Sequence, residues 1–501
     1  MAGLLAHRGP DDCGTYLEHP LALGFRRLAI QDLAPSGHQP MLSRDGRYII
    51  VFNGEIYNFV ELRAELAALG HSFRSTGDTE VLLAAYIQWG AECLPRLNGM
   101  WAFLVYDRLE RRLFGSRDRF GVKPLYWYRD ARSVLFASEI KAIRDCRSVQ
   151  LEVNWHTVAR HLLEDQLDVS EQTFYRGVEQ IPAGTAFEID SSGRMRQRRY
   201  WSLAALREDA AAIHEPVERF RTLFDDAVRL RMRSDVPVGV QLSGGLDSTS
   251  IITSMARQLA TVPGEAHGLH AFCYMAPQFD ERAQIHATLA QTGAHLVPLE
   301  STAHELWSVI QQHLWHQDEP VHSFTSVVGY HLMRLARSHG VKVLLNGQGA
   351  DEVLAGYSNY FNDYWAEIVR GGRLRDAHAA IRSFALAHGG SQLALAAAAL
   401  HTACASSLHR IPGYAALAAM RARARMRDNP WVSHDVKHYW MKAPVPERRY
   451  LTDSLRHSVE IESLPLYLRI EDRNSMAHGV EVRLPFLDYR LVTLAFSLGA
   501  R

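Results

Sequence analysis

A glycine-rich loop between an apolar strand and a helix is the feature that most limits how the second half of this chain can fold. The segment VPVGVQL at 236–242 is typical of a buried strand, SGGLDS follows at 243–248, and TSIITSMARQL at 249–259 has the periodicity of a helix. A second unit begins with VKVLLN at 341–346 and continues into GQGADE at 347–352. This alternation predicts a parallel sheet with helices on both faces.

The loop at 243–248 also has the chemistry of an anion site. Its backbone N–H groups and the N-terminus of the following helix converge on one place, where the glycines allow close approach. Ser243 and Ser248 add hydroxyl donors. A plain turn between strand and helix would explain a pair of glycines alone, but the strand before, the helix after and the acid inside favour a binding loop.

Two acids near this loop predict a magnesium site. Asp247 is a hard oxygen ligand of the kind that Mg²⁺ prefers, and Asp351 or Glu352 supplies a second acid after the later strand. Acids at a helix N-terminus are common without any ligand. Because ligand sites in parallel sheets lie at the carboxyl ends of strands, however, both loops are predicted to face one crevice.

The first half has a different pattern, of short strands, turns and two helices. Antiparallel sheet is predicted from RYIIVF at 47–52, ending at a turn at Asn53–Gly54, and from MWAFLVYD at 100–107 and RRLFGS at 111–116. Helices are predicted at 60–69, capped by Gly70, and at 79–89, ending at Gly90. The polar stretch at 206–216 predicts a boundary between two domains, 1–205 and 206–501.

Several motifs carry a resemblance to a known family. Four ordered segments, HRGPDD at 7–12, RRLAI at 26–30, FNGEIYN at 52–58 and STGDTE at 75–80, resemble the glutaminase domain of class II amidotransferases. SGGLDS resembles the pyrophosphate loop of N-type ATP pyrophosphatases, and 464–491 matches the family's SMA and EVRxPFLD region. Over nearly its full length the chain is similar to the glutamine-dependent asparagine synthetases.

That resemblance implies a fold and a reaction. The fold is an α+β sandwich like that of the N-terminal nucleophile hydrolases, incomplete in its first strand. An α/β ATP pyrophosphatase domain of the adenine nucleotide alpha hydrolase type follows it, with helical additions. The reaction is ATP-dependent adenylation of aspartate, then amidation by ammonia from glutamine, giving asparagine, AMP and pyrophosphate.

The resemblance also implies site residues. Arg27 and Asp78 would hold the carboxylate and amino group of glutamine, Asn53 and Gly54 would form the oxyanion hole, and Glu55 would complete the pocket. Contacts to ATP are implied for Leu242, Ser243, Gly244, Gly245, Leu246, Asp247, Ser248, Tyr274, Asn346 and Gly347, and Mg²⁺ ligation for Asp247 and Asp351.

Three departures from the family pattern leave alternatives open. The chain begins Met-Ala rather than with the family's nucleophilic cysteine, and Cys13 is internal and expected in a loop, so free ammonia is the expected nitrogen source. A first strand and a C-terminal lysine-containing segment are expected to be missing. Gln348 stands where the family often has Glu. The alternatives are a related amidotransferase that acts on another carboxylate, such as a peptide or a cell-surface precursor, a lactam-forming synthetase, or a non-catalytic binding or scaffold remnant.

Composition limits the partners. Lys+Arg and Asp+Glu both number 55, which gives no electrostatic reason to expect nucleic acid or an anionic membrane as partner. Five scattered cysteines and no signal peptide favour the cytoplasm. LALAAAAL at 393–400 is too short to span a membrane and is predicted to be a buried helix in a largely helical stretch without motifs, 360–445. No zinc site is predicted, and the oligomeric state stays open, with a homodimer as one option.

Overall fold

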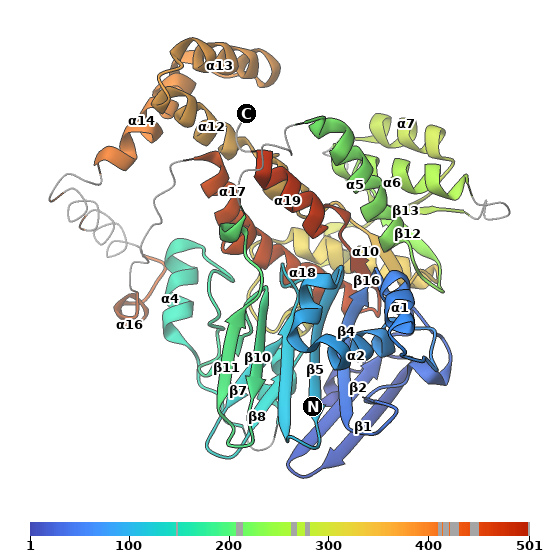
Figure 1. Cartoon of the computed structure of the whole chain (residues 1–501). Helices are drawn as coiled ribbons and strands as arrows, with labels where there is room; N and C mark the ends of the chain where they lie inside the picture. The colour runs from blue at the N-terminus through green and yellow to red at the C-terminus, as the bar shows by residue number, and fades with distance from the viewer. Residues whose placement is uncertain are drawn as a thin grey trace.

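A computed structural model of the chain describes residues 1–146, 149–206, 214–261, 268–275, 281–408, 413, 420, 430–440 and 450–498. The first half is built on antiparallel sheets, and the second half, on a parallel sheet, packs against one end of them (Figure 1). The stretch at 206–216, where the domain boundary is predicted, is described at 206 and 214–216, and 207–213 lie outside the described residues.

The first half contains a six-stranded sheet in the order β11-β10-β6-β5-β4-β3, a two-stranded sheet β1-β2 and a three-stranded sheet β8-β7-β9. The strands are β1 (Asp12–Glu18), β2 (Leu21–Arg27), β3 (Met41–Leu42), β4 (Tyr48–Ile56), β5 (Gly99–Asp107), β6 (Arg112–Arg117), β7 (Tyr126–Arg129), β8 (Val134–Ala137), β9 (Val178–Gln180), β10 (Thr185–Ile189) and β11 (Met195–Arg199). Their helices are η1 (Ala2–Leu5), α1 (Phe59–Ala68), α2 (Asp78–Trp89), η2 (Pro35–Gly37), η3 (Gly90–Arg96), α3 (Ile140–Arg144), α4 (Trp155–Glu164) and η4 (Leu203–Ala205).

Both faces of the six-stranded sheet are covered by apolar side chains. On one face, Phe52 and Phe103 pack with Leu66 and Leu82 from α1 and α2. On the other face, Leu104 and Phe187 pack with residues of the three-stranded sheet such as Phe136. The two helices predicted for this half are confirmed, with Gly90 as the C-cap of α2.

The turn predicted at Asn53–Gly54 is wrong. Strand β4 continues through both residues to Ile56, because Asn53 pairs with Ala102 and Gly54 with Trp101 on β5. Gly54 has φ = +147°, and a Cβ there would overlap the carbonyl oxygen of Met100. Only glycine therefore suits this strand position, and the Asn-Gly pair serves a close approach of two strands rather than a hairpin.

The second half is built on a five-stranded sheet in the order β14-β13-β12-β15-β16, and all four strand pairs are parallel, as predicted. Its strands are β12 (Val238–Gln241), β13 (His270–Tyr274), β14 (His295–Leu299), β15 (Val343–Leu345) and β16 (Glu481–Arg483). The first helices are α5 (Pro216–Arg231), α6 (Leu246–Leu259), α7 (Arg282–Thr292), α8 (Ala303–Ser308), α9 (Ile310–Gln317), α10 (Thr325–Ser338) and α11 (Ala350–Leu354). The later ones are α12 (Ser358–Arg370), α13 (Leu374–His388), α14 (Gln392–Leu408), α16 (His434–His438), α17 (Leu451–Glu460), α18 (Ser463–Met476), η6 (Pro485–Leu487) and α19 (Tyr489–Leu498).

Helices cover both faces of the parallel sheet, which explains its uninterrupted apolar strands. Phe224 of α5 and Ile251 of α6 pack on one face with Leu345. On the other face, Leu332 of α10 and Leu468 of α18 pack with Leu344. Neighbouring side chains of β15 thus point to opposite faces, and each face is closed by helices that lie far apart in sequence.

Helices α12 to α14 extend away from both sheets (Figure 1). The prediction of a buried helix at 393–400 is wrong in its burial: the segment lies in α14, but Leu393 is 84% exposed and Leu400 56% exposed. Only Ala399 of that segment is fully buried, against Trp365 and Ile381. The described part of 360–445 is largely helical, as predicted, whereas 409–412, 414–419, 421–429 and 441–445 lie outside the described residues.

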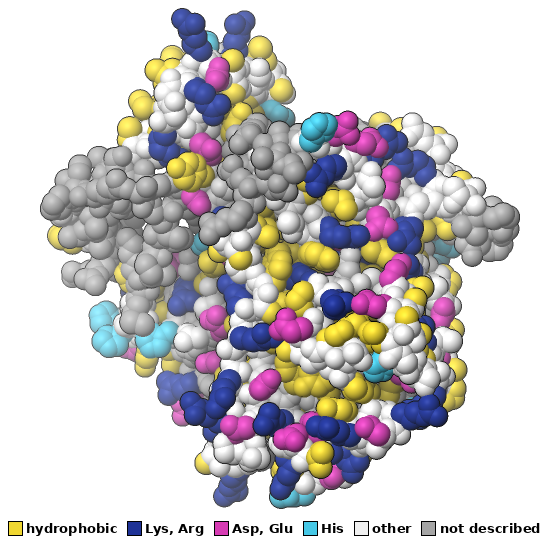
Figure 2. Space-filling view, viewed as in Figure 1, with side chains coloured by type: hydrophobic (Ala, Val, Ile, Leu, Met, Phe, Trp, Pro, Cys, Tyr) yellow, Lys and Arg dark blue, Asp and Glu magenta, His cyan; other side chains and the backbone are white. Residues whose placement is uncertain are grey.

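On the face that Figure 2 shows, Lys and Arg side chains are interspersed with Asp and Glu over both halves. This distribution agrees with the equal numbers of acidic and basic residues in the sequence. The helices that the structure describes are all too short or too polar to cross a membrane.

Candidate functional sites

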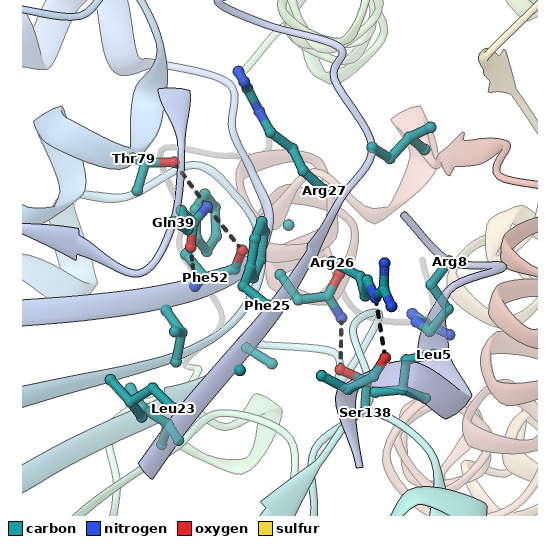
Figure 3. A pocket seen from close by; sticks show the side chains of 18 of the residues that line it. Leu5, Arg8, Leu23, Phe25, Arg26, Arg27, Gln39, Phe52, Thr79 and Ser138 are labelled. Atoms are coloured by element: carbon teal, nitrogen blue, oxygen red, sulfur yellow. Dashed lines mark hydrogen bonds between the residues drawn. The ribbon is translucent and has the colours of Figure 1, made fainter. Parts of the chain in front are cut away.

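A cavity of about 410 Å³ lies in the first half, and all five residues implied for glutamine binding line it. Arg27 ends β2, Asn53, Gly54 and Glu55 lie on β4, and Asp78 begins α2. Residues far apart in sequence are brought together because β4 pairs within the sheet while α2 packs on its face. Figure 3 shows the cavity, with Arg26 and Arg27 leaving β2 in opposite directions.

The Arg27 guanidinium is buried and bonded to backbone. It donates to the carbonyl oxygens of Ala34 at 3.0 Å, Gln31 at 3.4 Å, and Asp32. These bonds hold a cation beside the cavity, and a ligand carboxylate would have to share or replace them.

The Asp78 carboxylate is also buried, and one of its oxygens accepts the Ile56 N–H at 2.8 Å. Burial raises the pKa of Asp78 to about 7, with the nearby Glu481 charge adding to the effect. Glu55 has a raised pKa for the same reason, and Asp78 adds like-charge repulsion. Two acids that resist ionisation side by side would gain from a ligand cation such as an amino group.

The residues implied for the oxyanion hole, Asn53 and Gly54, both line this cavity. The Asn53 side-chain amide donates to the Ser138 hydroxyl at 3.5 Å, which is long for a hydrogen bond. Cys13 is exposed on β1, not in the loop that was predicted, and it is not among the residues that line the cavity. Among the described residues, the lining of this cavity therefore includes the polar side chains implied for glutamine binding but no cysteine.

A second cavity, of about 530 Å³, lies at the carboxyl ends of the parallel strands. Leu242 and Ser243 follow β12, Tyr274 ends β13, and Gln348 follows β15; all four line the cavity. Each loop thus contributes one residue to this cavity, Ser243 or Gln348. The other residues implied for ATP or Mg²⁺ are not among those that line it, so their contacts stay a prediction: Gly244, Gly245, Leu246, Asp247, Ser248, Asn346, Gly347 and Asp351.

The SGGLDS loop connects β12 to α6 as predicted. Ser248 Oγ accepts the Ser243 N–H at 3.1 Å and donates to the Gly245 carbonyl at 3.3 Å. Gly244 has φ = +77°, where other residues are strained. The loop is thus held open at a helix N-terminus by its own hydroxyls, a geometry suited to phosphate oxygens.

Asp247 and Asp351 come together beside this loop. Burial raises the pKa of Asp247 to about 6, and the charge of Asp351 adds to it. A Cβ at Gly347 would lie 2.9 Å from the Asp247 Cβ, so the two loops touch. Glu352 instead is fully buried and accepts the Tyr357 hydroxyl at 2.9 Å, which makes Asp351 the better second acid.

Asn346 ties the second loop to its neighbours. Its Nδ2 donates to Gln241 Oε1 at 2.9 Å and to Glu471 Oε1 at 3.0 Å, and its Oδ1 accepts the Gln348 N–H at 2.9 Å. Sequence reasoning missed Glu471, and also Arg282, His322 and Tyr467, all of which line the cavity. Glu471 falls inside the matched segment 464–491, but only the tertiary packing of α18 shows that it faces the loops.

Helix α18 lies between the two cavities. Its last residue, Met476, lines the first cavity, while Glu471, five positions earlier, lines the second. At a rise of about 1.5 Å per residue, those positions are about 7.5 Å apart along the axis. One helix thus borders both cavities.

Buried ion pairs join the halves beside this helix. Arg483 approaches Glu55 at 3.5 Å and Glu481 at 2.9 Å, and it donates to the carbonyls of Arg231 at 2.9 Å and Arg233 at 2.5 Å. Further pairs across the halves are Lys123–Glu481, Arg8–Asp472, Lys141–Asp318 and Arg469–Asp168. The first cavity is thus fixed to the second half by charge pairs that are out of solvent.

The predicted absence of zinc remains a prediction. His434 and His438 stand one turn apart on α16. No group of three or more His, Cys, Asp or Glu with metal-site geometry is found where the chain is described.

Comparison with known proteins divides the chain in the same way. A family model described as a glutamine amidotransferase domain matches residues 1–201, and one described as asparagine synthase matches residues 219–501. Asparagine synthetase [glutamine-hydrolyzing] 1 of Bacillus subtilis is 34% identical over 362 residues, 72% of this chain and 55% of that protein. The chain thus spans just over half the length of this relative.

Two further relatives are covered more fully. A putative asparagine synthetase [glutamine-hydrolyzing] 2 of Methanocaldococcus jannaschii is 34% identical over 401 residues, 74% of each chain. A putative asparagine synthetase [glutamine-hydrolyzing] of Mycobacterium bovis is 31% identical over 532 residues, 99% of this chain and 77% of that protein.

Proposed function

Because the chain belongs to the glutamine-hydrolysing asparagine synthetase family, we propose that it activates the side-chain carboxylate of aspartate with ATP and amidates it with ammonia. The observation that carries this proposal is that Asp351 lies close to Asp247 of the SGGLDS loop, at the carboxyl ends of the parallel strands. The finer folds we propose are an N-terminal nucleophile hydrolase-like sandwich and an ATP pyrophosphatase domain.

The ATP half has residues for each part of the adenylation. Backbone N–H groups of the loop at 243–248 and the N-terminus of α6 would hold the departing pyrophosphate. Asp247 and Asp351 fit Mg²⁺, because their carboxylates resist ionisation beside each other and a divalent cation would relieve the repulsion. When bound, Mg²⁺ would neutralise charge on the phosphate oxygens. Leu242 and Tyr274 line the cavity where the adenine would lie.

The glutamine half has residues for binding the nitrogen donor. Arg27 would hold the carboxylate of glutamine, Asp78 and Glu55 its amino group, and Asn53 with Gly54 the developing oxyanion. Because none of the described residues that line this cavity is a cysteine, assays of this chain should supply ammonium chloride as nitrogen source.

An acceptor other than aspartate is the second candidate. Gln348 lines the second cavity in the loop where the family often has Glu, so one carboxylate that could contact the acceptor is replaced by a neutral amide. A comparison of aspartate with other carboxylic acids in acceptor-dependent exchange of pyrophosphate into ATP decides between them. Exchange driven by aspartate supports the first candidate, and exchange driven only by another acid supports the second.

Glutamine binding should depend on pH through Asp78. Burial raises its pKa to about 7, so protonation below pH 7 removes the charge that would pair with an ammonium group. We expect the affinity for glutamine to fall about tenfold per pH unit below 7 and to level off above it.

Titration calorimetry with glutamine between pH 5.5 and 8.5 measures this dependence. Asp78→Asn should bind weakly and without the slope, and Arg27→Ala should bind weakly at every pH. Arg112→Ala is the matched control, because Arg112 is exposed on β6 and is not among the residues that line the cavity. A wild-type affinity for glutamine that does not change with pH would contradict the role of Asp78, and wild-type affinity in Arg27→Ala would contradict the role of Arg27.

A further inference from the structure

Glu471 is an acidic side chain that faces the second cavity without a basic partner. Within the described residues, its carboxylate has one hydrogen bond, from Asn346 Nδ2 at 3.0 Å, and forms no ion pair. Several other acids at the junction of the two halves have basic partners: Glu139 and Asp472 with Arg8, Asp318 with Lys141, Glu481 with Arg483, and Asp488 with Arg231. A carboxylate left unpaired in a cavity is suited to a cationic ligand.

The surroundings of Glu471 place it against the loop that carries Gln348. Asn346 accepts from the Gln348 backbone and donates to Glu471, so a single side chain fixes both residues. The same amide donates to Gln241 at the end of β12, next to the SGGLDS loop. Glu471 is therefore rigidly positioned, on a helix and by a bonded neighbour, at the edge of the adenylation site.

The electrostatics favour a ligand with positive charge. Burial raises the pKa of Glu471 to about 7, the Asn346 hydrogen bond opposes the shift, and the neighbouring charge of Asp472 adds to it. A cation placed against the carboxylate would restore its ionised form. The neutral Gln348 nearby cannot supply this charge, although it lines the same cavity.

We propose that Glu471 receives the α-ammonium group of an amino-acid acceptor and thereby selects acceptors that carry an amine. This inference rests on the proposed function and extends it by naming the residue that distinguishes aspartate from a plain dicarboxylic acid. Glu471, on α18, supplies to this cavity the negative charge that the neutral Gln348 does not have. Glu471 is then a specificity residue for adenylation, and its effect precedes any attack by ammonia.

Acceptor-dependent exchange of pyrophosphate into ATP tests the proposal, because this half-reaction needs no nitrogen source. The wild-type chain is assayed with aspartate and with succinate, which has the same reacting carboxylate but no amine. Glu471→Gln should lower kcat/KM for aspartate by about 10- to 100-fold, the usual effect of losing one charge-assisted hydrogen bond. The loss should appear mainly in KM, and kcat/KM for succinate should change by less than about threefold.

Glu471→Gln retains an oxygen that can accept from Asn346, so the loop should keep its place. Glu300→Gln is the matched control, since Glu300 is exposed at the end of β14 and its change should affect neither acceptor. Unchanged succinate kinetics in Glu471→Gln show that the adenylation site is intact. Glu471→Asp should restore part of the preference for aspartate.

Three results would overturn the inference. Aspartate kinetics unaffected by Glu471→Gln, equal losses for both acceptors, or a wild-type chain that uses succinate as well as aspartate would each contradict an ammonium contact at this carboxylate. These outcomes leave ATP-driven adenylation standing. A wild-type chain that exchanges pyrophosphate with no carboxylic acid would instead refute the proposed function, and the inference with it.

Discussion

Asp247→Asn should reduce acceptor-dependent exchange of pyrophosphate into ATP by about 100- to 1,000-fold, the effect expected when one group that stabilises developing charge is removed. Asp247 lies in the SGGLDS loop at the start of α6, and its pKa is raised to about 6 by burial and by Asp351. Asn keeps the shape but loses the charge that a divalent cation would require. The assay follows labelled pyrophosphate into ATP with aspartate and Mg²⁺ present.

The same substitution should leave the fold intact. Because the two carboxylates repel each other, removing one charge should leave the melting temperature at neutral pH unchanged or raised. Asp376→Asn is a matched control. Asp376 also lies in the first turn of a helix, α13, but it is exposed and is not among the residues that line the second cavity. Wild-type exchange by Asp247→Asn would show that the loop does not have the role proposed for it.

Arg483→Met should have the largest effect on stability, a loss of about 3–5 kcal/mol, because it leaves buried acids without their cation. Arg483 is fully buried between Glu55 and Glu481. It also donates to the carbonyl of Arg231, the last residue of α5, and to the carbonyl of Arg233. Methionine keeps an unbranched side chain but cannot donate hydrogen bonds and carries no charge. Urea denaturation followed by tryptophan fluorescence measures the change in the free energy of unfolding.

A surface pair provides the comparison for this measurement. Arg257 contacts Asp225 at 2.6 Å, but its side chain is half exposed, so Arg257→Met should cost no more than about 1 kcal/mol. Equal effects of the two substitutions would mean that the charges between the halves are not excluded from solvent. Because Arg483 also contacts Glu55, its loss should further weaken glutamine binding, which the calorimetry above can detect.

The parts of the site that a single sequence predicts are those formed by contiguous segments. SGGLDS was expected between a strand and a helix, and the structure has it between β12 and α6. Parallel topology places both strand ends at one edge of the sheet, and Asp247 and Asp351 lie close enough there to interact, although neither is among the residues that line the second cavity. Local chemistry and general topology were enough for these features.

Predictions failed where a local preference competed with a tertiary contact. Asn53–Gly54 has the residues of a hairpin turn, yet β5 pairs through it and makes it a strand. The apolar run at 393–400 suggests a buried helix, but composition alone does not provide a partner surface, and Leu393 remains exposed. Local patterns specify a type of element more reliably than they specify its neighbours.

The place of Glu471 in the second cavity and the contacts of Arg483 could not be predicted from the sequence, because both depend on residues that are far apart in the chain. Glu471 is 125 positions from Asn346, and Arg483 is more than 400 positions from Glu55. Nothing in the sequence around α18 shows that one helix separates two cavities. Such roles depend on how two sheets are packed together, a property of the whole fold.

The most direct test of the central claim is the identity of the products formed from ATP. The chain is incubated with ATP, Mg²⁺, aspartate and ammonium chloride, and nucleotides, phosphates and amino acids are separated and quantified. We predict AMP, pyrophosphate and asparagine in equal amounts, because the loop at 243–248, with Mg²⁺ on Asp247 and Asp351, would hold a departing pyrophosphate. Formation of ADP and inorganic phosphate instead would contradict it.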